Sequence, residues 1–403
     1  MPQNLLEPTW TDLDSDELRL LLRQRFDGGL GQYDGDDDKL YLPAAGPRSR
    51  IVLTYADSKI ASVEPGVAFD AAEWEGVRQE IEHSLLAGVP KVGRGYSFSV
   101  FPVQGSWRGV RSGLQILPAP KDAPRSGGAP DPFILEFAIN DGGLSFITNY
   151  RRLREHRRFT LLLNVLLAGR TSCLPQRQRY YWAKVPLDET NPFPEDFKWV
   201  VEGYEGPLDN IVLDQHSRPS ETRIEEVDPS EHDSKVIGSD CLRVPADLDA
   251  QICGYLGLAP DDREKFDRAL FWIDMSSHQF TVSVSAALAA LVSAIEALTE
   301  RGDPHYFKCP VCDKQTQHEE RGSTRRFKDF IDTYAPDIGA GNRTEMYRLR
   351  SGILHGSKLI EIDYSLAFGW DPPWWAQREL HWDLWKITRV ALRQWLKKRA
   401  PAQ

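Results

Sequence analysis

The sequence has few cysteines, no long uninterrupted apolar run and no excess of positive charge. Its five cysteines are an odd number and most are widely spaced, so they do not indicate a disulfide framework, and a reducing cytoplasm is the expected compartment. Residues 1–11 lack the basic and apolar segments of a signal peptide. The longest apolar stretch, residues 282–298, contains three serines and a glutamate, whereas a membrane span needs about 20 apolar residues. We therefore expect no membrane partner.

The formal net charge of −10 argues against a protein surface that is basic all over. It leaves room for a local basic cleft, because attraction of an anionic partner depends on the local potential and not on the total charge. The 403 residues exceed one ordinary domain of about 150 residues, so two or three domains are expected.

The patterning predicts an α+β protein with a β-rich N-terminal domain at residues 1–148, a linking region at 149–241 and an all-α helical bundle at 242–403. One amphipathic helix is expected at residues 69–86 of the first domain. Short β-prone runs are expected at residues 50–55, 96–103, 113–117, 133–138 and 144–148.

The linking region begins with a predicted basic helix at residues 149–169, and an acidic segment without helical periodicity follows at 187–240. The helix carries five arginines near its start: Arg151, Arg152, Arg154, Arg157 and Arg158. Two interpretations are open. The helix packs between domains with a solvated basic face, which we favour, or it holds the backbone of an RNA.

The last domain has helical periodicity from residue 244 onwards. Helices are expected at residues 246–256, from 261, and at 277–299, 324–334, 344–355 and 379–398. Between the last two, an aromatic loop with two prolines is expected at residues 370–375.

The predicted helix at residues 344–355 carries Arg350 and His355, separated by four residues. Histidine titrates near neutral pH, so it can take a proton from a ribose 2′-hydroxyl or give one to the departing 5′-oxygen. Arginine stays charged and can bind a phosphate with two donors while negative charge develops on it. The pair therefore suits RNA cleavage without a metal.

The spacing of this pair distinguishes little by itself, because Arg78 and His83 have the same spacing, and so do Arg151 and His156. The first of these pairs lies among glutamates and the second lies in a basic run. Only the residues around Arg350 and His355 can therefore distinguish this pair from the other two.

Three features of those surroundings favour a site. Ser351 and Gly352 are small and let another helix approach, and a glycine inside a helix costs about 1 kcal/mol relative to alanine unless packing requires it. His355 lies at the expected helix end, where the peptide dipole favours the imidazolium. On an ideal helix, Arg350 and His355 differ by about 140° and about 7.5 Å of rise. We therefore expect a homodimer that pools two such pairs in one cleft.

The string from Tyr347 to Gly356 resembles the signature of the HEPN family, in which an arginine and a polar residue are followed a few positions later by a histidine. The alanine-rich segment at 285–298, which contains Glu296, resembles the preceding helix of such proteins, and residues 387–396 resemble their closing helix. The resemblance covers about residues 242–398. It is nearest to the HEPN domain of ApeA-type proteins of bacterial abortive infection, in which a sensing-type domain precedes the nuclease.

The resemblance implies a metal-independent endoribonuclease that leaves a 2′,3′-cyclic phosphate or 3′-phosphate and a 5′-hydroxyl, with Arg350 and His355 as the catalytic pair. It assigns Ser351 to the polar position, where many members have Asn, Asp or His. Glu296 either orients Arg350 or forms a structural ion pair with it, and Tyr347 is a supporting or a core residue. An RNA substrate, a cytoplasmic homodimer and an unknown trigger at the N-terminal domain are expected, with no cofactor for catalysis. Candidate RNA-binding residues, from a mild basic excess, are Arg325, Arg326, Arg348 and Lys358.

A metal site is also predicted. Cys309 and Cys312 form a close thiolate pair, with His305 before it and His318 after it. Two cysteines and two histidines can complete a tetrahedral zinc site, which would be structural because four protein ligands leave no open position. The spacing differs from that of a standard zinc finger, so a tight turn with two free thiols is the alternative, and a second protomer can also complete the site.

Two further functions remain open. One is a non-catalytic HEPN module that mediates dimerisation or binds nucleotide. The other is a regulatory nucleic-acid binder that uses the basic helix at residues 149–169.

Overall fold

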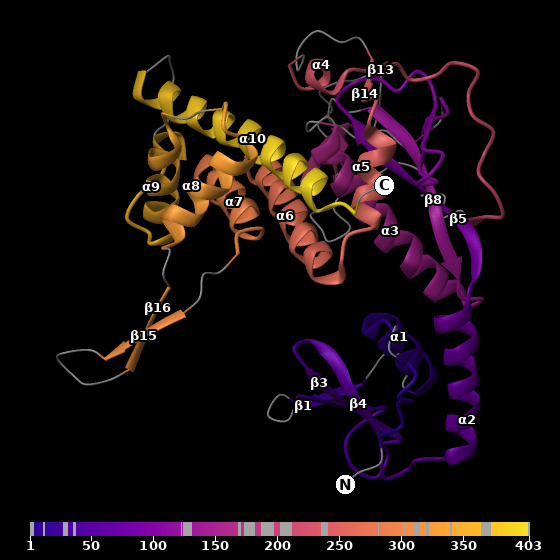
Figure 1. Ribbon diagram of the computed structural model, residues 1–403. Helices are drawn as coiled ribbons and strands as arrows, with labels where there is room; N and C mark the ends of the chain where they lie inside the picture. The colour runs from indigo at the N-terminus through magenta and orange to yellow at the C-terminus, as the bar shows by residue number, and fades with distance from the viewer. Residues whose placement is uncertain are drawn as a thin grey trace. The chain divides into compact units, whose positions relative to one another are not determined.

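A computed structural model gives the fold of the 403-residue chain (Figure 1). It describes residues 4–10, 13–26, 31–34, 38–121, 123, 131–167, 171–172, 182–186, 197–201, 212–234, 241–280, 282–300, 304–308, 315–319, 322–338, 341–363 and 372–401. Strands are concentrated in the N-terminal part and helices in the C-terminal part, which confirms the predicted α+β class in outline. The identity of the helical part as a HEPN domain stays a prediction.

The contacts within the chain divide it into two units. Unit 1 comprises Met1–Gly95, Glu136–His156 and Asp209–Arg218, and unit 2 comprises Tyr96–Leu135, Arg157–Leu208 and Pro219–Gln403. The division passes through three elements: β5 (Val89–Ser99), β8 (Asp131–Asp141) and α3 (Ser145–Leu166). The domain boundaries predicted at residues 148 and 241 stay a prediction.

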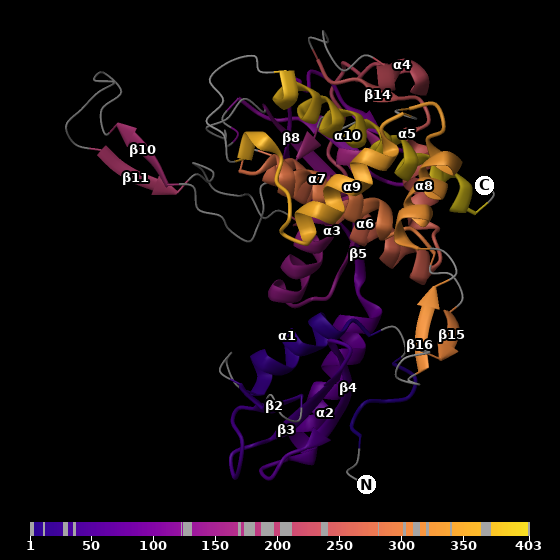
Figure 2. The ribbon, with the colours of Figure 1, turned by 90° about the vertical axis from the view of Figure 1, so that its left-hand side faces the viewer.

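Unit 1 contains an antiparallel sheet with the order β1-β2-β3-β4, and α1 packs beside it (Figure 2). Its first elements are α1 (Ser15–Phe26), β1 (Gln32–Asp34), β2 (Lys39–Leu42), β3 (Ile51–Ala56), β4 (Lys59–Pro65), α2 (Ala71–Glu80) and the π-helix η1 (Ile81–Ala87). The sequence patterns do not predict α1. Asp14 begins this helix, because its carboxylate accepts a hydrogen bond from the backbone N–H of Glu17 (3.0 Å). The helix buries three leucines: Leu18, Leu21 and Leu22.

The helix predicted at residues 69–86 is confirmed as α2 and η1. Asp70 caps α2 by accepting a hydrogen bond from the backbone N–H of Ala72 (2.8 Å). Trp74, Val77 and Ile81 are buried in the core of unit 1, as the amphipathic pattern requires.

The strand predicted at residues 144–148 is wrong, because α3 begins at Ser145. Asp141 accepts a hydrogen bond from the backbone N–H of Gly143 (3.0 Å) and is also bonded to the hydroxyl group of Thr148. These bonds turn the chain after β8, and the helix then buries Ile147 in the core of unit 1. The local sequence is β-prone, but this packing decides the outcome.

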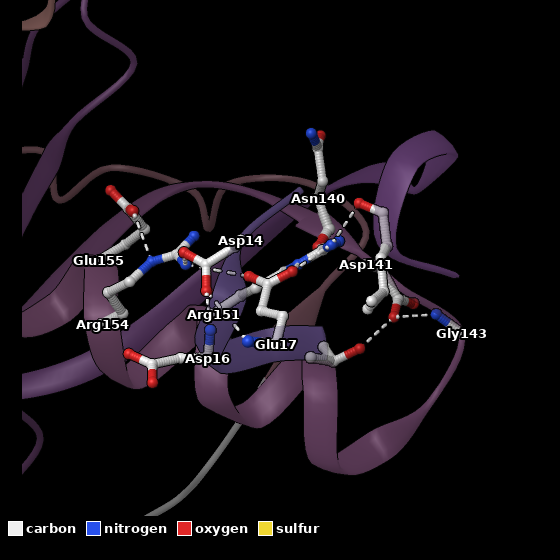
Figure 3. Close-up of polar contacts among 11 residues, drawn as sticks. Asp14, Asp16, Glu17, Asn140, Asp141, Gly143, Arg151, Arg154 and Glu155 are labelled. Carbon is white, nitrogen blue, oxygen red and sulfur yellow. Dashed lines mark hydrogen bonds and ion pairs between the residues drawn. The ribbon is translucent and has the colours of Figure 1, made fainter. Parts of the chain in front are cut away.

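The first arginines of α3 are occupied inside unit 1 (Figure 3). The guanidinium of Arg151 donates two hydrogen bonds to Glu17 of α1 (2.9 and 2.6 Å), and both side chains are buried. It also donates to the backbone carbonyls of Leu85 (2.8 Å) and Asn140 (3.0 Å). Arg154 pairs with Asp14 (2.7 Å) and Glu17 (3.0 Å). These contacts favour the packing interpretation of the basic helix over the RNA-binding one.

The second half of α3 packs within unit 2. Arg158 donates to the hydroxyl group of Tyr255 (2.7 Å), which is fully buried. Asn164 accepts a hydrogen bond on its side-chain oxygen from the buried Arg389 (3.3 Å). The helix is therefore an integral part of the fold in both units, and the contacts of Arg151, Arg154 and Arg158 weigh against the nucleic-acid binder that uses this helix.

A second sheet has the order β12-β5-β8-β7-β6, with β9 paired to β5. The remaining elements of this part are β6 (Trp107–Arg108), β7 (Gln115–Pro118), β9 (Thr171–Ser172), β10 (Trp182–Pro186), β11 (Phe197–Val201), β12 (Val212–Leu213), β13 (Glu226–Val227), α4 (Pro229–Ser234) and β14 (Val244–Pro245). Within unit 1, the buried carboxylate of Glu136 accepts hydrogen bonds from Arg94 (2.7 Å) and Ser217 (2.6 Å). The sequence predicted an irregular acidic segment at 187–240, but β11, β12, β13 and α4 lie within it.

The last part of unit 2 consists mainly of helices. They are α5 (Leu248–Leu256), α6 (Pro260–Gln279), α7 (Val284–Glu296), α8 (Ser323–Tyr334), α9 (Arg343–Leu354), the 3-10 helix η2 (Glu361–Asp363) and α10 (Pro372–Arg399), with the hairpin strands β15 (Pro304–Lys308) and β16 (Gln315–Glu319) between α7 and α8. The aromatic loop predicted at residues 370–375 is helical from Pro372 onwards. Proline fits the first helical turn, because the N–H that it lacks has no acceptor within the helix.

Helix α7 lies beside α6, α9 and α10 (Figure 2). Ten of its residues are buried, and four of these are alanines, whose short side chains let neighbouring helices come close. No helix in the described ranges is long and apolar enough to cross a membrane.

The buried ion pair of unit 1 gives a first prediction. Replacing Arg151 by Met removes two hydrogen bonds from the buried Glu17 carboxylate and leaves it paired only with the part-exposed Arg154. We expect the free energy of unfolding to fall by about 3 kcal/mol, the lower end of the range for a broken buried pair. Urea unfolding of the full chain measures this loss. Arg78→Met is the matched control, because Arg78 pairs with Glu75 and Glu82 at the surface of α2. Equal shifts of the two midpoints would contradict the role given to Arg151.

Candidate active site

The candidate site lies where the C-terminal end of α7 meets α9. Glu296, the last residue of α7, forms an ion pair with Arg350 of α9. The second carboxylate oxygen of Glu296 accepts a hydrogen bond from the hydroxyl group of Tyr347 (3.1 Å), one turn before Arg350. The structure thus brings together the three residues Arg350, Glu296 and Tyr347 that the sequence placed in or beside the site.

The Arg350 guanidinium is held on two sides. Besides its pairing with Glu296, it lies over the ring of Tyr347, 5.6 Å from the ring centroid. The side chain of Arg350 is 21% exposed, so part of it reaches solvent. Burial is the main cause that raises the pKa of Tyr347, which keeps its hydroxyl protonated as a donor. Arg350 is therefore a fixed cation with an accessible edge.

His355 lies at the C-cap of α9 and is exposed. Its backbone N–H donates to the carbonyl of Ser351 (3.1 Å), and Gly356 follows with a φ of +68°. A glycine adopts this left-handed conformation without a steric cost, so it ends the helix immediately after the histidine. Within the described residues, no hydrogen bond or ion pair joins the imidazole of His355 to Arg350.

The small residues of the motif face the chain's own return segment. A Cβ atom on Gly352 would lie 3.0 Å from the side-chain carbons of Lys358, and the carbonyl of Gly352 accepts hydrogen bonds from the backbone N–H groups of Ser357 (2.9 Å) and Lys358 (3.1 Å). Gly352 thus has a packing reason inside one chain, which differs from the expected approach of another helix. Ser351 is half-buried on the same turn.

A residue that the sequence did not single out, Asp363, fixes the segment after His355. Its carboxylate accepts hydrogen bonds from the Ser283 hydroxyl and from the backbone N–H groups of Val284 and Ser285, each at 2.8 Å. It therefore caps the N-terminus of α7 from a position 80 residues further along the chain. Ser283 could be recognised as a capping residue in the sequence, but nothing local connects it to Asp363.

The structure separates the three Arg–His pairs of equal spacing. Arg151 and His156 are buried in unit 1, where no substrate reaches them. Arg78 and His83 are at the surface of a helix, and Arg78 is engaged by two glutamates on its own helix. Only the third pair combines an arginine held by a distant carboxylate with an exposed histidine at a helix end.

The candidate RNA-binding residues lie on α8, α9 and the segment after α9. Arg348 is exposed and pairs with Glu345 (2.7 Å), and Arg325 is exposed and lies 3.9 Å from Asp329. Lys358 is exposed and Arg326 is half-buried. Acidic residues on the same helix thus partly balance the charges of Arg348 and Arg325, which weakens their attraction for an RNA at physiological salt.

The predicted zinc ligands Cys309 and Cys312 lie outside the described residues. His305 of β15 and His318 of β16 are direct partners in the antiparallel pairing of these two strands. Of the described residues, none form a cluster suited to a metal ion. The zinc site stays a prediction.

Comparison of the chain with models of known protein families, with characterised proteins and with solved structures gives no significant match. The resemblance to the HEPN family therefore rests on the motif and the flanking helices quoted above.

The cap formed by Asp363 gives a second prediction. Replacement by Asn keeps the size but loses the charge, and we expect the free energy of unfolding to fall by about 0.5–2 kcal/mol. Burial opposes ionisation, but hydrogen bonds from Ser285 and Ser283 outweigh it and lower the pKa of Asp363. A lowered pKa means that the stabilisation is present above the unfolded value of about 3.9 and is lost as the pH falls through the folded value.

Thermal unfolding of wild type and Asp363→Asn at several pH values measures this difference. The destabilisation of Asp363→Asn relative to wild type should have its full size near pH 7 and should become smaller at acidic pH. Asp337→Asn, at an exposed aspartate after α8, is the control and should change the midpoint little. A difference between wild type and Asp363→Asn that does not depend on pH would contradict the charged cap.

Proposed function

We propose that this protein is a metal-independent endoribonuclease in which Arg350 and His355 are the catalytic residues. The observation that carries the proposal is the fixed, partly accessible Arg350, held by Glu296 and Tyr347 on the helix that ends in the exposed His355. The HEPN resemblance suggests a toxin-like or antiviral effector of abortive infection, in which the N-terminal part receives an unknown trigger.

The chemistry follows from the side chains. The ribose 2′-hydroxyl loses its proton to an imidazole, and its oxygen attacks the adjacent phosphorus. The bond from phosphorus to the 5′-oxygen breaks, and that oxygen takes a proton from an imidazolium, which leaves a 2′,3′-cyclic phosphate and a 5′-hydroxyl. Arg350 donates to the phosphate oxygens while their negative charge increases. Glu296 positions the guanidinium and does not take part in proton transfer.

A dimer supplies what a single copy lacks. The reaction needs a neutral imidazole as base at the 2′-oxygen and an imidazolium as acid at the 5′-oxygen, and two histidines can supply both protonation states at once. The angular offset of about 140° between Arg350 and His355 on one helix keeps them from facing one phosphate together. Two copies related by a two-fold axis place two arginines and two histidines around one cleft.

The alternative is a non-catalytic HEPN module that mediates dimerisation or binds nucleotide. The pairing of Arg350 with Glu296 favours it, because an arginine whose charge is already balanced can be purely structural. In that case Arg350 contributes to the stability of the contact between α7 and α9 and has no role in turnover.

The third prediction separates the two functions. With excess EDTA, purified wild-type protein should cleave total RNA, and His355→Ala should lower the rate by about 10²–10⁴-fold. Arg350→Ala should lower it by about 10²–10³-fold, because a donor to the developing charge is lost. Gel analysis and end-group chemistry of the fragments measure both the rate and the product ends. His83→Ala is the matched control, because it removes an exposed histidine from a pair of the same spacing and should leave the rate unchanged.

Cleavage that survives in His355→Ala would exclude this site as its source. If wild type does not cleave, the 242–403 fragment, free of the N-terminal part, is tested for folding by circular dichroism and then for cleavage. A folded but inactive fragment would favour the non-catalytic module.

The fourth prediction concerns the dimer. If the cleft needs two copies, the specific activity should fall on dilution in step with the loss of dimer, measured by sedimentation velocity at the same concentrations. A monomer with full activity would contradict the shared cleft.

A further inference from the structure

Unit 1 has a pocket of about 350 Å³ between α1 and the far end of its four-stranded sheet. Six residues that carry charge or an aromatic ring line it: Arg19, Arg23, Tyr33, Asp38, Tyr55 and Asp57. None of them belongs to the site around α9, which lies in unit 2. The pocket is near the lower limit of the volumes, about 300–1,000 Å³, that small-molecule sites occupy.

The pairing of the strands explains why the two tyrosines meet α1. Tyr33 is the partner of Leu40, and Leu40 is the partner of Leu53, so the three share one face of the sheet. Tyr55 lies two residues after Leu53 on β3 and therefore has the same face. Leu40 and Leu53 are in the core that α1 covers, whereas Tyr33 is 57% exposed and Tyr55 is half-buried. The pocket therefore lies at the end of this face of the sheet, beside the part that α1 covers.

The helix side of the pocket is positively charged. Arg19 and Arg23 are four residues apart on α1, so they lie on the same side of the helix, one turn from each other. Both charges act on the hydroxyl group of Tyr55, whose pKa burial raises and the two arginines lower. Arg19 donates through one nitrogen to Asp16 (2.7 Å), and a guanidinium has five N–H donors.

The sheet side of the pocket is acidic at its rim. Asp38 and Asp57 lie in the two hairpin turns, with positive φ angles of 51° each, and the neighbouring Ser58 has a φ of 64°. These three are the non-glycine residues with positive φ in the part of the chain that the structure describes. Asp38 accepts a hydrogen bond from the hydroxyl group of Tyr33 (2.9 Å), which holds the first ring at the rim.

We propose that this pocket binds a free nucleoside monophosphate. The phosphate lies between the guanidinium groups of Arg19 and Arg23, whose positive charges attract it and whose N–H groups donate to its oxygens. The base lies against the rings of Tyr33 and Tyr55, which offer apolar faces for stacking. The carboxylates of Asp38 and Asp57 accept hydrogen bonds from amino groups of the base or hydroxyl groups of the ribose.

The same arrangement disfavours the simpler ligands. Inorganic phosphate uses the two arginines but neither tyrosine ring, and a nucleoside uses the rings but not the arginines. A longer nucleic acid carries further phosphates, which the carboxylates at the rim repel. The combination of cationic helix, aromatic face and acidic rim therefore suits one phosphate attached to one nucleoside. This inference does not depend on the proposed ribonuclease activity.

The fifth prediction tests this ligand on the full chain by isothermal titration calorimetry. The probes are AMP, GMP, CMP and UMP, with the four nucleosides and inorganic phosphate as comparison. We expect at least one monophosphate to bind at least about tenfold more tightly than its nucleoside and than phosphate. The double substitution Arg19→Gln with Arg23→Gln should weaken this binding at least about tenfold, and Tyr33→Ala should weaken it too.

Two controls locate the binding. Arg50→Gln removes an exposed arginine of unit 1 that pairs with Glu73 (2.7 Å), away from the pocket, and should keep the wild-type affinity. Arg350→Ala alters the candidate site in unit 2 and should also keep it. Thermal unfolding confirms that each variant is folded.

Four outcomes would overturn the proposal: no monophosphate binds at millimolar concentration, the arginine variant binds as wild type does, binding is lost in Arg350→Ala, or only an oligonucleotide binds. None of them bears on cleavage by Arg350 and His355, so failure here and failure of the ribonuclease are told apart.

Discussion

Helix α7 is buried along almost its whole length, and both of its ends are held by residues far away in the sequence. Its N-terminal N–H groups need acceptors, and Asp363 supplies them. Its last residue, Glu296, needs a cation, and Arg350 supplies it. The helix that carries Arg350 and His355 and the segment that follows it are thus fixed at two points on one rigid element. A site built in this way is positioned by the core of the bundle and not by a loop.

A second buried charge has the same function in unit 1. The carboxylate of Glu17 in α1 is buried, and the two hydrogen bonds that Arg151 donates to it offset the cost of removing its charge from water. This pairing fixes α1 against α3, and the remaining donors of Arg151 bind two backbone carbonyls. Helix α1 also carries Arg19 and Arg23, which line the pocket of unit 1.

The three Arg–His pairs show why spacing alone has little meaning. An arginine among buried partners, as at Arg151, contributes to folding, and an arginine among glutamates of its own helix, as at Arg78, contributes to the surface of that helix. Arg350 differs from Arg78 because its partner comes from another helix, and it differs from Arg151 because part of it remains accessible. Burial and the origin of the partner, both properties of the folded chain, distinguish the pairs. The sequence suggested the same choice from context, through the glycine and the helix end.

The sequence by itself determined the elements whose signals are local. The amphipathic pattern around Trp74, the alanine-rich α7 and the end of α9 at Gly356 were all predicted, because periodicity and capping depend on neighbouring residues. Tertiary structure alone decided that residues 144–148 join a helix, that Arg151 and Arg152 of α3 are buried and that Asp363 caps a helix 80 residues earlier. These outcomes depend on which distant groups share one core. A buried charge or N–H group is stabilised by hydrogen bonds to those distant partners, and a local sequence pattern does not show which partners they are.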